Sequence, residues 1–197
     1  MECMRASAMQ PKKTRKKRLY TKDVVFVALF TALIAVCAWI TVPSAVPFTL
    51  QTFAIFLTLG LLGGKRGTLA VLCYILLGAF GVPVFSSFRG GIGVLSGVTG
   101  GYIVGFLFSA LAYWGITTLT NGRFTWKIVG MGVGLIVCYA FGTAWFVFVK
   151  GRTGSPVDFV GALTLCVVPF IAFDVAKLFL ALFLTRILTT RLHLDNK

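Results

Sequence analysis

An aspartate and a lysine, Asp174 and Lys177, stand inside the long apolar run PFIAFDVAKLFLALFL. A charge at the middle of a membrane-spanning helix costs roughly 2.5 to 3.5 kcal/mol, so each of these side chains needs a compensating partner. Residues at positions i and i+3 lie on one helical face. Two explanations fit this spacing: the side chains neutralise each other as an ion pair, or their shared face lines a polar cavity and holds a ligand. Ionisable groups within a membrane segment favour the second explanation.

A glycine-rich segment, SSFRGGIGVLSGVTGGY (residues 86–102), offers a second set of groups. Its glycines, Gly90 and Gly91 among them, leave backbone N–H groups open to a ligand, and Arg89 provides a cation for an anionic group. Tyr102 ends the segment. The segment matches neither a phosphate loop nor a dinucleotide fingerprint, because it has no G-K-[ST] sequence and no strand context. A tight re-entrant turn is the alternative explanation.

Two further segments carry polar side chains between apolar ones. VPFTLQT (residues 46–52) contains Thr49 and Gln51, a hydroxyl and an amide that both donate and accept hydrogen bonds. CYAFGTAWF contains Tyr139. For Gln51 the alternative is an interfacial turn that faces water, and for Tyr139 it is an aromatic anchor at the membrane surface.

The elements that must position these residues are membrane helices. The chain has 197 residues, of which 58% are hydrophobic and 12% charged, and its mean hydropathy is +0.94. Because a soluble domain carries about twice this charged fraction, we expect an all-α integral membrane protein. We expect a basic tail over residues 1–19, a membrane domain over residues 20–191 and a polar tail over residues 192–197. Within the membrane domain, six apolar runs predict spans near residues 23–41, 48–62, 68–84, 100–119, 128–149 and 159–188.

The distribution of basic residues predicts the orientation of these spans. With six spans, fifteen of the 19 Lys and Arg residues fall on the side that holds both termini. Arg89, Lys150 and Arg152 fall on the opposite side, and Lys177 lies within the last span. Short cytoplasmic loops are enriched in Lys and Arg, so both termini are expected in the cytoplasm. We interpret the basic tail, the main source of the net charge of +14, as a topology signal that also attracts anionic lipid, and expect no nucleic-acid partner.

Several classes of chemistry are disfavoured by simple counts. The five cysteines show no C-x-x-C or Cys/His spacing, and the single histidine, His193, lies in the C-terminal tail. We therefore expect no metal, no cofactor and no enzymatic activity, with the cysteines serving as small buried residues. Ala28 and Ala32, four positions apart in the first span, leave room for a partner helix to approach.

Five motifs occur in an order that resembles the BioY family, the biotin-binding S components of energy-coupling-factor transporters. They are VPFTLQT, GLLGGKRG, GAFGVPVF, RGG followed by GVTGGY, and D-x-x-K in the last span. The resemblance covers about residues 20–191. Val98 departs from it, because the family commonly has proline at this position.

The resemblance implies a six-helix S-component bundle in a prokaryotic cell membrane, with cytoplasmic termini and a biotin site near the outer face. It implies partnership with a transmembrane coupling subunit, contacted through Ala28 and Ala32, and with two ATPase subunits. The biotin site implied by the family pattern comprises Thr49, Gln51, Arg89, Gly90, Gly91, Tyr102, Tyr139, Asp174 and Lys177.

Chemistry then suggests roles for these residues. An ionised Asp174 accepts hydrogen bonds and suits the ureido N–H groups, whereas Lys177 donates and suits the ureido oxygen. Arg89 and the neighbouring glycine N–H groups suit the carboxylate, and Tyr102 and Tyr139 suit the rings. The competing assignment places Lys177 on the carboxylate. An S component for riboflavin or thiamin and a small membrane enzyme that uses Asp174 as a base are the alternative functions.

Overall fold

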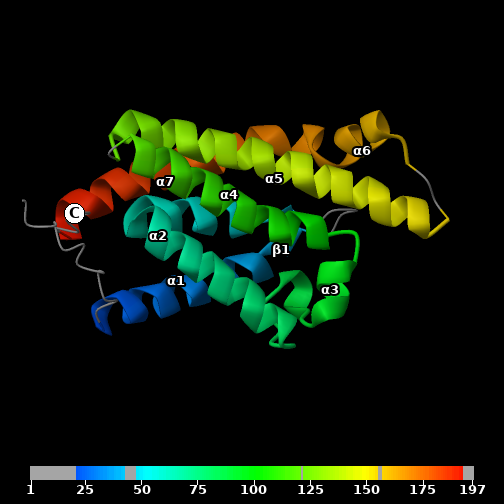
Figure 1. Cartoon of the computed structure of the whole chain (residues 1–197), viewed down its shortest axis with the longest axis horizontal. Coiled ribbons are helices and arrows are strands. Elements are labelled where there is room, and N and C mark those ends of the chain that lie inside the picture. The colour runs from blue at the N-terminus through cyan, green and yellow to red at the C-terminus, as the bar shows by residue number, and fades with distance from the viewer. Residues whose placement is uncertain (1–20, 43–47, 121, 155–156, 193–197) are drawn as a thin grey trace, which may run out of the picture.

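The computed structural model describes residues 21–42, 48–120, 122–154 and 157–192, which form a mostly helical protein (Figure 1). The predicted tail over residues 1–19 and the C-terminal residues 193–197 lie outside the described residues. The elements are, in chain order, α1 (Thr21–Trp39), β1 (Thr41–Val42), β2 (Phe48–Thr49), α2 (Gln51–Ala79), the 3₁₀ helix η1 (Ser86–Phe88), α3 (Ile92–Ser96), α4 (Gly100–Leu119), α5 (Phe124–Arg152), α6 (Phe159–Cys166) and α7 (Val168–Leu192).

Five of the described helices, α1, α2, α4, α5 and α7, are long and apolar enough to cross a membrane. The described residues are helical as expected, apart from β1 and β2. These two strands pair antiparallel and have two residues each. The bounds of α4 coincide with the predicted span over residues 100–119, and α1 and α5 differ from theirs by a few residues.

Most of the second and third predicted spans, residues 48–62 and 68–84, lies in the single element α2 (Gln51–Ala79). Its backbone is non-helical at Gly63, with φ 76° and ψ 174°, a positive φ that glycine adopts without a Cβ penalty. In a continuous helix, positions 59 and 67 would lie about 12 Å apart. A Cβ atom at Gly67 would lie 3.1 Å from the Cα atom of Leu59, so the chain folds back at Gly63. The helix then ends at Ala79 and not near residue 84, because Gly81 has φ +96°.

The prediction of one helix over residues 159–188 is wrong. The structure has two helices, α6 and α7, separated at Val167, where φ is −125° and ψ is −53°. Pro169 explains the break: it has no N–H to donate to the preceding turn, and its fixed φ suits the first turn of a new helix. The break at Val167 lies seven residues before Asp174.

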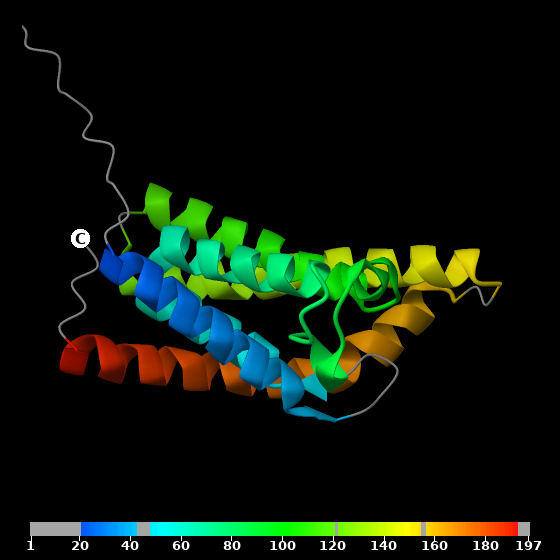
Figure 2. The same cartoon turned by 90° about the horizontal axis from the view of Figure 1, so that it is seen from below.

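Helices α4 and α5 lie side by side (Figures 1 and 2), and glycines at their contact let the two backbones approach closely. A methyl group at Gly101 would overlap Trp145, and one at Gly142 would overlap the ring of Tyr102. Gly134 meets Ser109 in the same way. Small residues of this kind let helix backbones approach closely within a membrane, where packing replaces the hydrophobic effect as the driving force.

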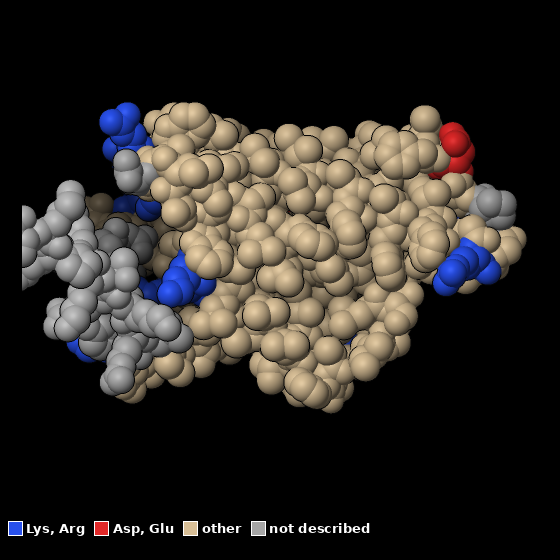
Figure 3. Space-filling view, viewed as in Figure 1, with Lys and Arg blue, Asp and Glu red and all other residues tan. Residues whose placement is uncertain are grey.

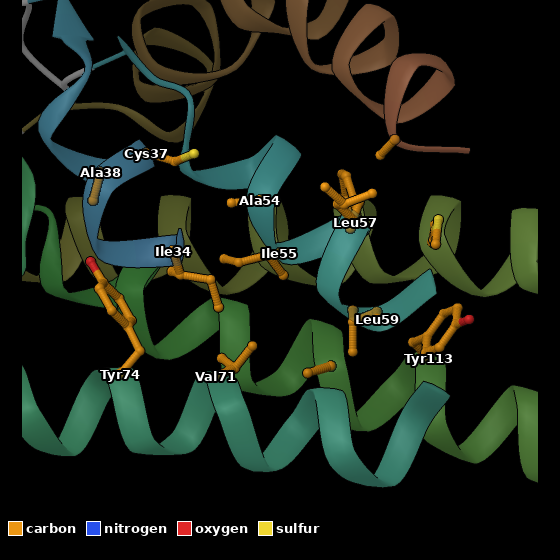
Figure 4. Packing of buried hydrophobic residues seen from close by; sticks show 14 of the residues in the cluster. Ile34, Cys37, Ala38, Ala54, Ile55, Leu57, Leu59, Val71, Tyr74 and Tyr113 are labelled. Carbon is orange, nitrogen blue, oxygen red and sulfur yellow. The ribbon is translucent and has the colours of Figure 1, made fainter. Parts of the chain in front are cut away.

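The largest buried cluster joins α1 and both segments of α2 (Figure 4). Ile34 of α1 lies between Ile55 of the first segment and Val71 of the second, and all three side chains are buried. Tyr113 of α4 extends the cluster. These contacts fix the first segment of α2, whose N-terminal end carries pocket residues.

On the face shown in Figure 3, charged side chains lie mainly toward the two ends of the molecule. Lys and Arg side chains appear at both ends of this face, with an acidic side chain at one of them. The start of α1 and the end of α7 lie at the same end of the molecule (Figures 1 and 2). Asp23 of α1 forms an ion pair with Arg66 of α2, with 2.9 Å between Oδ1 and Nη2. An uncharged band between charged ends is the surface expected of a membrane-embedded bundle.

Candidate ligand-binding site

One pocket brings together residues from β2, α2, α4, α5, α6 and α7. It combines a polar cluster with apolar and aromatic walls, the general composition of small-molecule sites. Its lining residues are Phe48, Thr49, Thr52, Tyr102, Phe106, Cys138, Tyr139, Cys166, Phe170, Asp174 and Lys177.

The polar cluster contains a buried ion pair between Asp174 and Lys177. Lys177 Nζ lies 2.9 Å from Asp174 Oδ1, and the two residues are 5% and 8% exposed. The i, i+3 spacing in α7 therefore produces the mutual ion pair, and the same pair also lines a pocket. The structure thus shows the ion pair of the first explanation and the cavity-lining face of the second, and the binding of a ligand there stays a prediction.

Lys177 makes three hydrogen bonds to described residues. Its Nζ donates to the Thr49 carbonyl oxygen over 2.6 Å, to Asp174 Oδ1 over 2.9 Å and to Thr52 Oγ1 over 3.2 Å. The ammonium also lies 3.8 Å from the centroid of the Phe48 ring, close enough for a cation–π interaction. Because an ammonium has three N–H donors, these three acceptors use all of them.

Asp174 accepts hydrogen bonds on both carboxylate oxygens. Oδ1 accepts from Lys177 and, over 2.8 Å, from Thr52 Oγ1. Oδ2 accepts from the hydroxyl of Tyr139 on α5. A carboxylate offers about four lone-pair positions, so these contacts leave one acceptor position for a ligand.

The walls are formed by aromatic rings and two thiols. Phe48 stacks on Phe170, with 5.7 Å between ring centroids, and the Tyr102 hydroxyl lies 3.2 Å from Thr143 Oγ1. Cys138 and Cys166 are buried free cysteines, in agreement with the role expected of them. Among the residues that the structure describes, no three His, Cys, Asp or Glu side chains are grouped to hold a metal ion.

Comparison with known proteins places this architecture in a family. Residues 9–193 match the BioY family. This chain belongs to the BioY family. The sequence is 44% identical over 161 residues to a biotin transporter BioY of Thermotoga maritima, covering 81% of this chain and 91% of the relative. It is 41% identical over 157 residues to a probable biotin transporter BioY of Pyrococcus horikoshii, covering 79% and 89% respectively.

The fold matches a solved structure of the same kind. The crystal structure of the S-component for biotin from an ECF-type ABC transporter aligns with a TM-score of 0.75 and 25% sequence identity, over 86% of this chain and 91% of the other. The resemblance drawn from the sequence motifs is therefore confirmed. Together with the five candidate spans, the match makes the chain a multi-pass membrane protein.

Five of the nine residues expected from the BioY pattern line the pocket. They are Thr49, Tyr102, Tyr139, Asp174 and Lys177. Gln51, the first residue of α2, is 4% exposed, and its Nε2 atom has no hydrogen-bond partner among the described residues. It is buried but is not part of the lining.

The structure does not bring Arg89, Gly90 and Gly91 into the pocket lining. Arg89 is exposed and follows η1. Gly90 packs against the carbonyl oxygen of Val82, which a Cβ atom would overlap, and Gly91 has φ +94°. The backbone of a tight turn therefore accounts for both glycines without a ligand.

Two pocket residues that contact the charges directly were not predicted from the sequence. Thr52 hydrogen-bonds to both Asp174 and Lys177, and Phe48 supplies the ring below the ammonium. Both belong to VPFTLQT, the motif that supplied Thr49 and Gln51. Membership of this motif was the available signal, because Phe48 lies in β2 and Thr52 in the first turn of α2 and no helical spacing relates them.

Ala28 and Ala32 are both exposed on α1. Their neighbours Val25, Leu29 and Val36 are exposed as well, at 60%, 61% and 47%. This face of α1 is apolar and is not buried by any of the described residues, whereas the opposite face, with Ile34, is buried. The face is therefore open to lipid or to a partner helix.

Proposed function

We propose that this chain is the biotin-binding S component of an energy-coupling-factor uptake transporter. The observation that carries the proposal is a pocket, in a BioY family member, that holds a buried carboxylate beside a buried ammonium between aromatic walls. The curated relatives quoted above are named as biotin transporters. The chain acts as a transporter subunit and not as an enzyme.

The polar pair suits the ureido group of biotin. This group has two N–H donors and one carbonyl acceptor, and the pocket offers the opposite groups on Asp174 and Lys177. The open acceptor position on Asp174 takes a ureido N–H. The ureido oxygen takes an N–H of Lys177 and replaces one of its present acceptors. The contact to Thr52 Oγ1, at 3.2 Å the longest of the three, is the easiest to exchange, because hydrogen bonds weaken with distance.

The apolar walls suit the fused rings. Tyr102 and Tyr139 flank the polar pair from α4 and α5, so rings bound at Asp174 would contact them. Aromatic side chains bury large apolar areas and prefer offset or edge-on contacts with other rings. The two tyrosines therefore act as ring contacts, with Thr49 and Gln51 as further polar contacts.

Arg89, with the N–H groups of Gly90 and Gly91, is our assignment for the carboxylate of the valerate tail. Arg89 is exposed, which suits the charged end of a ligand that stays near water while the ring system is buried. Its guanidinium matches a carboxylate by forming two parallel hydrogen bonds. The competing assignment places Lys177 on the carboxylate.

The proposed topology has six crossings with both termini in the cytoplasm. Three features support it: the reversal at Gly63 that divides α2, the placement of the start of α1 and the end of α7 at one end (Figure 2), and the count of fifteen basic residues that six spans assign to the side of the termini. Biotin is then captured at the extracellular face. Ala28 and Ala32 contact the transmembrane coupling subunit, and two ATPase subunits supply the energy.

The test is a binding titration of the purified chain in detergent with biotin, riboflavin and thiamin. The proposal predicts saturable binding of biotin alone, and loss of that binding in the Asp174→Asn variant. Tighter binding of riboflavin or thiamin would assign a different vitamin. Conversion of biotin to a product would favour the membrane-enzyme alternative.

A further inference from the structure

Thr52, a residue without an expected role, lies between the two buried charges of the pocket. Its Oγ1 atom is 2.8 Å from Asp174 Oδ1 and 3.2 Å from Lys177 Nζ. A hydroxyl has one hydrogen to donate and lone pairs to accept with. Since an ionised carboxylate only accepts and an ammonium only donates, Thr52 donates to Asp174 and accepts from Lys177. One hydroxyl therefore contacts both members of the ion pair.

The other two threonines of α2, Thr58 and Thr68, each bond to their own helix. Thr58 donates to the carbonyl oxygen of Ala54 over 2.6 Å, and Thr68 to that of Gly64 over 2.7 Å. Both are bonds to the preceding turn, which is where a threonine in a helix usually donates; Thr68 Oγ1 also lies 3.2 Å from the carbonyl oxygen of Ala110 on α4. Thr52 instead reaches α7, more than 120 positions away in the sequence, and it lines the pocket.

The geometry also limits where Lys177 can place its ammonium. The Thr49 carbonyl, Asp174 Oδ1 and Thr52 Oγ1 take its three N–H groups, and the Phe48 ring lies below it. A ligand carbonyl can bind Lys177 only by taking the place of one acceptor. Thr52 Oγ1 is the most distant of the three acceptors, and its bond to Asp174 is independent of Lys177. It can therefore be displaced from the ammonium without separating the ion pair.

We propose that Thr52 is a positioning residue for recognition of the ureido group. Its hydroxyl holds Asp174 and Lys177 so that the acceptor and the donor face the same ligand group. It also accepts the Lys177 N–H that the ligand carbonyl takes over when the ligand binds. This inference rests on the proposed function. A hydroxyl that served only to pack α2 against α7 would affect all ligands of the pocket equally.

The experiment compares biotin with 2-iminobiotin, in which the ureido oxygen is replaced by nitrogen and the carbonyl acceptor is lost. The full-length chain is purified as wild type, Thr52→Val, Thr52→Ser and Thr58→Val, and the dissociation constants for both ligands are measured. Valine keeps the shape of threonine and removes the hydroxyl. Thr58→Val removes a buried hydroxyl from the same helix away from the pocket.

Thr52→Val is expected to weaken biotin binding about tenfold, the usual scale for a hydrogen bond to a charged group. It is expected to weaken 2-iminobiotin binding less, so the dissociation constant for 2-iminobiotin divided by that for biotin becomes smaller than in the wild type. Thr52→Ser should restore both the affinity and the ratio, and Thr58→Val should leave the ratio unchanged. Thermal unfolding of each variant, with Thr52→Ala as a second test of the same position, identifies any variant that fails to fold.

Two results would overturn the role of Thr52. One is a folded Thr52→Val or Thr52→Ala variant that binds biotin as the wild type does, and the other is an equal loss for both ligands. A folded wild-type chain that binds neither ligand would instead overturn the proposed function, so the two failures are distinguishable.

Discussion

The ammonium of Lys177 donates a hydrogen bond to the backbone carbonyl oxygen of Thr49 over 2.6 Å. This bond joins α7 to the end of the short hairpin that precedes α2, so the last helix and the segment after the first helix meet at one point. The same ammonium pairs with Asp174. The Lys177 side chain therefore contacts the hairpin, the Asp174 carboxylate and the pocket. Substitution of Lys177 can show how much it contributes to folding stability and how much to ligand binding.

The charges of the ion pair can be removed singly or together. Lys177→Met leaves Asp174 as a buried charge without its cation, which costs about 3 to 5 kcal/mol of unfolding free energy. The double variant Lys177→Met with Asp174→Asn should recover most of that stability, because no uncompensated charge remains. Biotin binding should stay lost in the double variant, since donor and acceptor are both gone.

Thermal unfolding and biotin titration of the same preparations measure these two effects. Recovery of biotin binding along with stability in the double variant would show that the pair is only structural.

Removal of the Tyr139 hydroxyl tests how much its hydrogen bond to Asp174 contributes to biotin binding. Tyr139 donates to Asp174 Oδ2, and hydrogen bonds to charged groups contribute about 1.5 to 3 kcal/mol. Tyr139→Phe should therefore weaken biotin binding by about tenfold or more in an equilibrium binding assay. Tyr113→Phe is the matched control, because the Tyr113 hydroxyl is buried with no hydrogen-bond partner among the described residues. Equal effects of the two variants would argue against a specific contribution of Tyr139.

Enlargement of one glycine tests whether the Tyr102 ring must keep its position. A Cβ atom at Gly142 would overlap that ring, and overpacking of this kind costs about 1 to 3 kcal/mol. Gly142→Ala should lower the thermal unfolding midpoint and weaken biotin binding. Gly132→Ala, in the same helix, adds a methyl group with nothing within 4 Å, and both quantities should stay near the wild-type values. A Gly142→Ala variant with unchanged binding would contradict a role for Tyr102 as a ring contact.

Arg89 and Lys177 can be assigned to the two ends of the ligand by comparing biotin with biotinamide. If Arg89 binds the carboxylate, amidation weakens binding to the wild type and has a much smaller effect on Arg89→Ala. If amidation costs the Arg89→Ala variant as much affinity as it costs the wild type, the carboxylate binds elsewhere. A reduced amidation effect in Lys177→Ala would then favour the competing assignment.

Docking on the coupling subunit can be separated from ligand binding at α1. Ala28→Leu adds bulk to an exposed face on which close helix approach requires small side chains. Biotin binding to the isolated chain should be unchanged, whereas ATP-driven uptake with the energising module should be strongly reduced. Ala172→Leu, at an exposed alanine of α7, should leave both intact. ATP-independent accumulation of biotin in liposomes that contain this chain alone would contradict the division between capture and energy supply.

Local features of the sequence predicted much of this structure. The i, i+3 spacing of Asp174 and Lys177 placed both charges on one face, and the apolar run over residues 100–119 predicted α4 with its bounds. The break at Val167 was missed because hydropathy continues across it, although Pro169 marks it. Tertiary contacts were not predictable in the same way. The bond from Thr52 to Asp174 joins positions 122 residues apart, and no spacing within VPFTLQT indicates it.

The glycine-rich segment shows the limit of composition as a signal. Glycines next to an arginine are typical both of a backbone anion site and of a tight turn. Gly90 packs on a carbonyl oxygen and Gly91 has a positive φ, so the turn alone accounts for both. The part of Arg89 in binding therefore depends on the biotinamide comparison and not on the pocket geometry.

Binding of biotin in the pocket around Asp174 and Lys177 can be read from the mass of the ligand that the protein selects. The purified chain is incubated with equal concentrations of biotin, riboflavin and thiamin, washed and denatured, and the released ligand is identified by mass spectrometry. Unmodified biotin is expected from the wild type and no ligand from the double variant Lys177→Met with Asp174→Asn. Release of another vitamin from the wild type, or release of biotin from the double variant in equal amount, would contradict binding of biotin in this pocket.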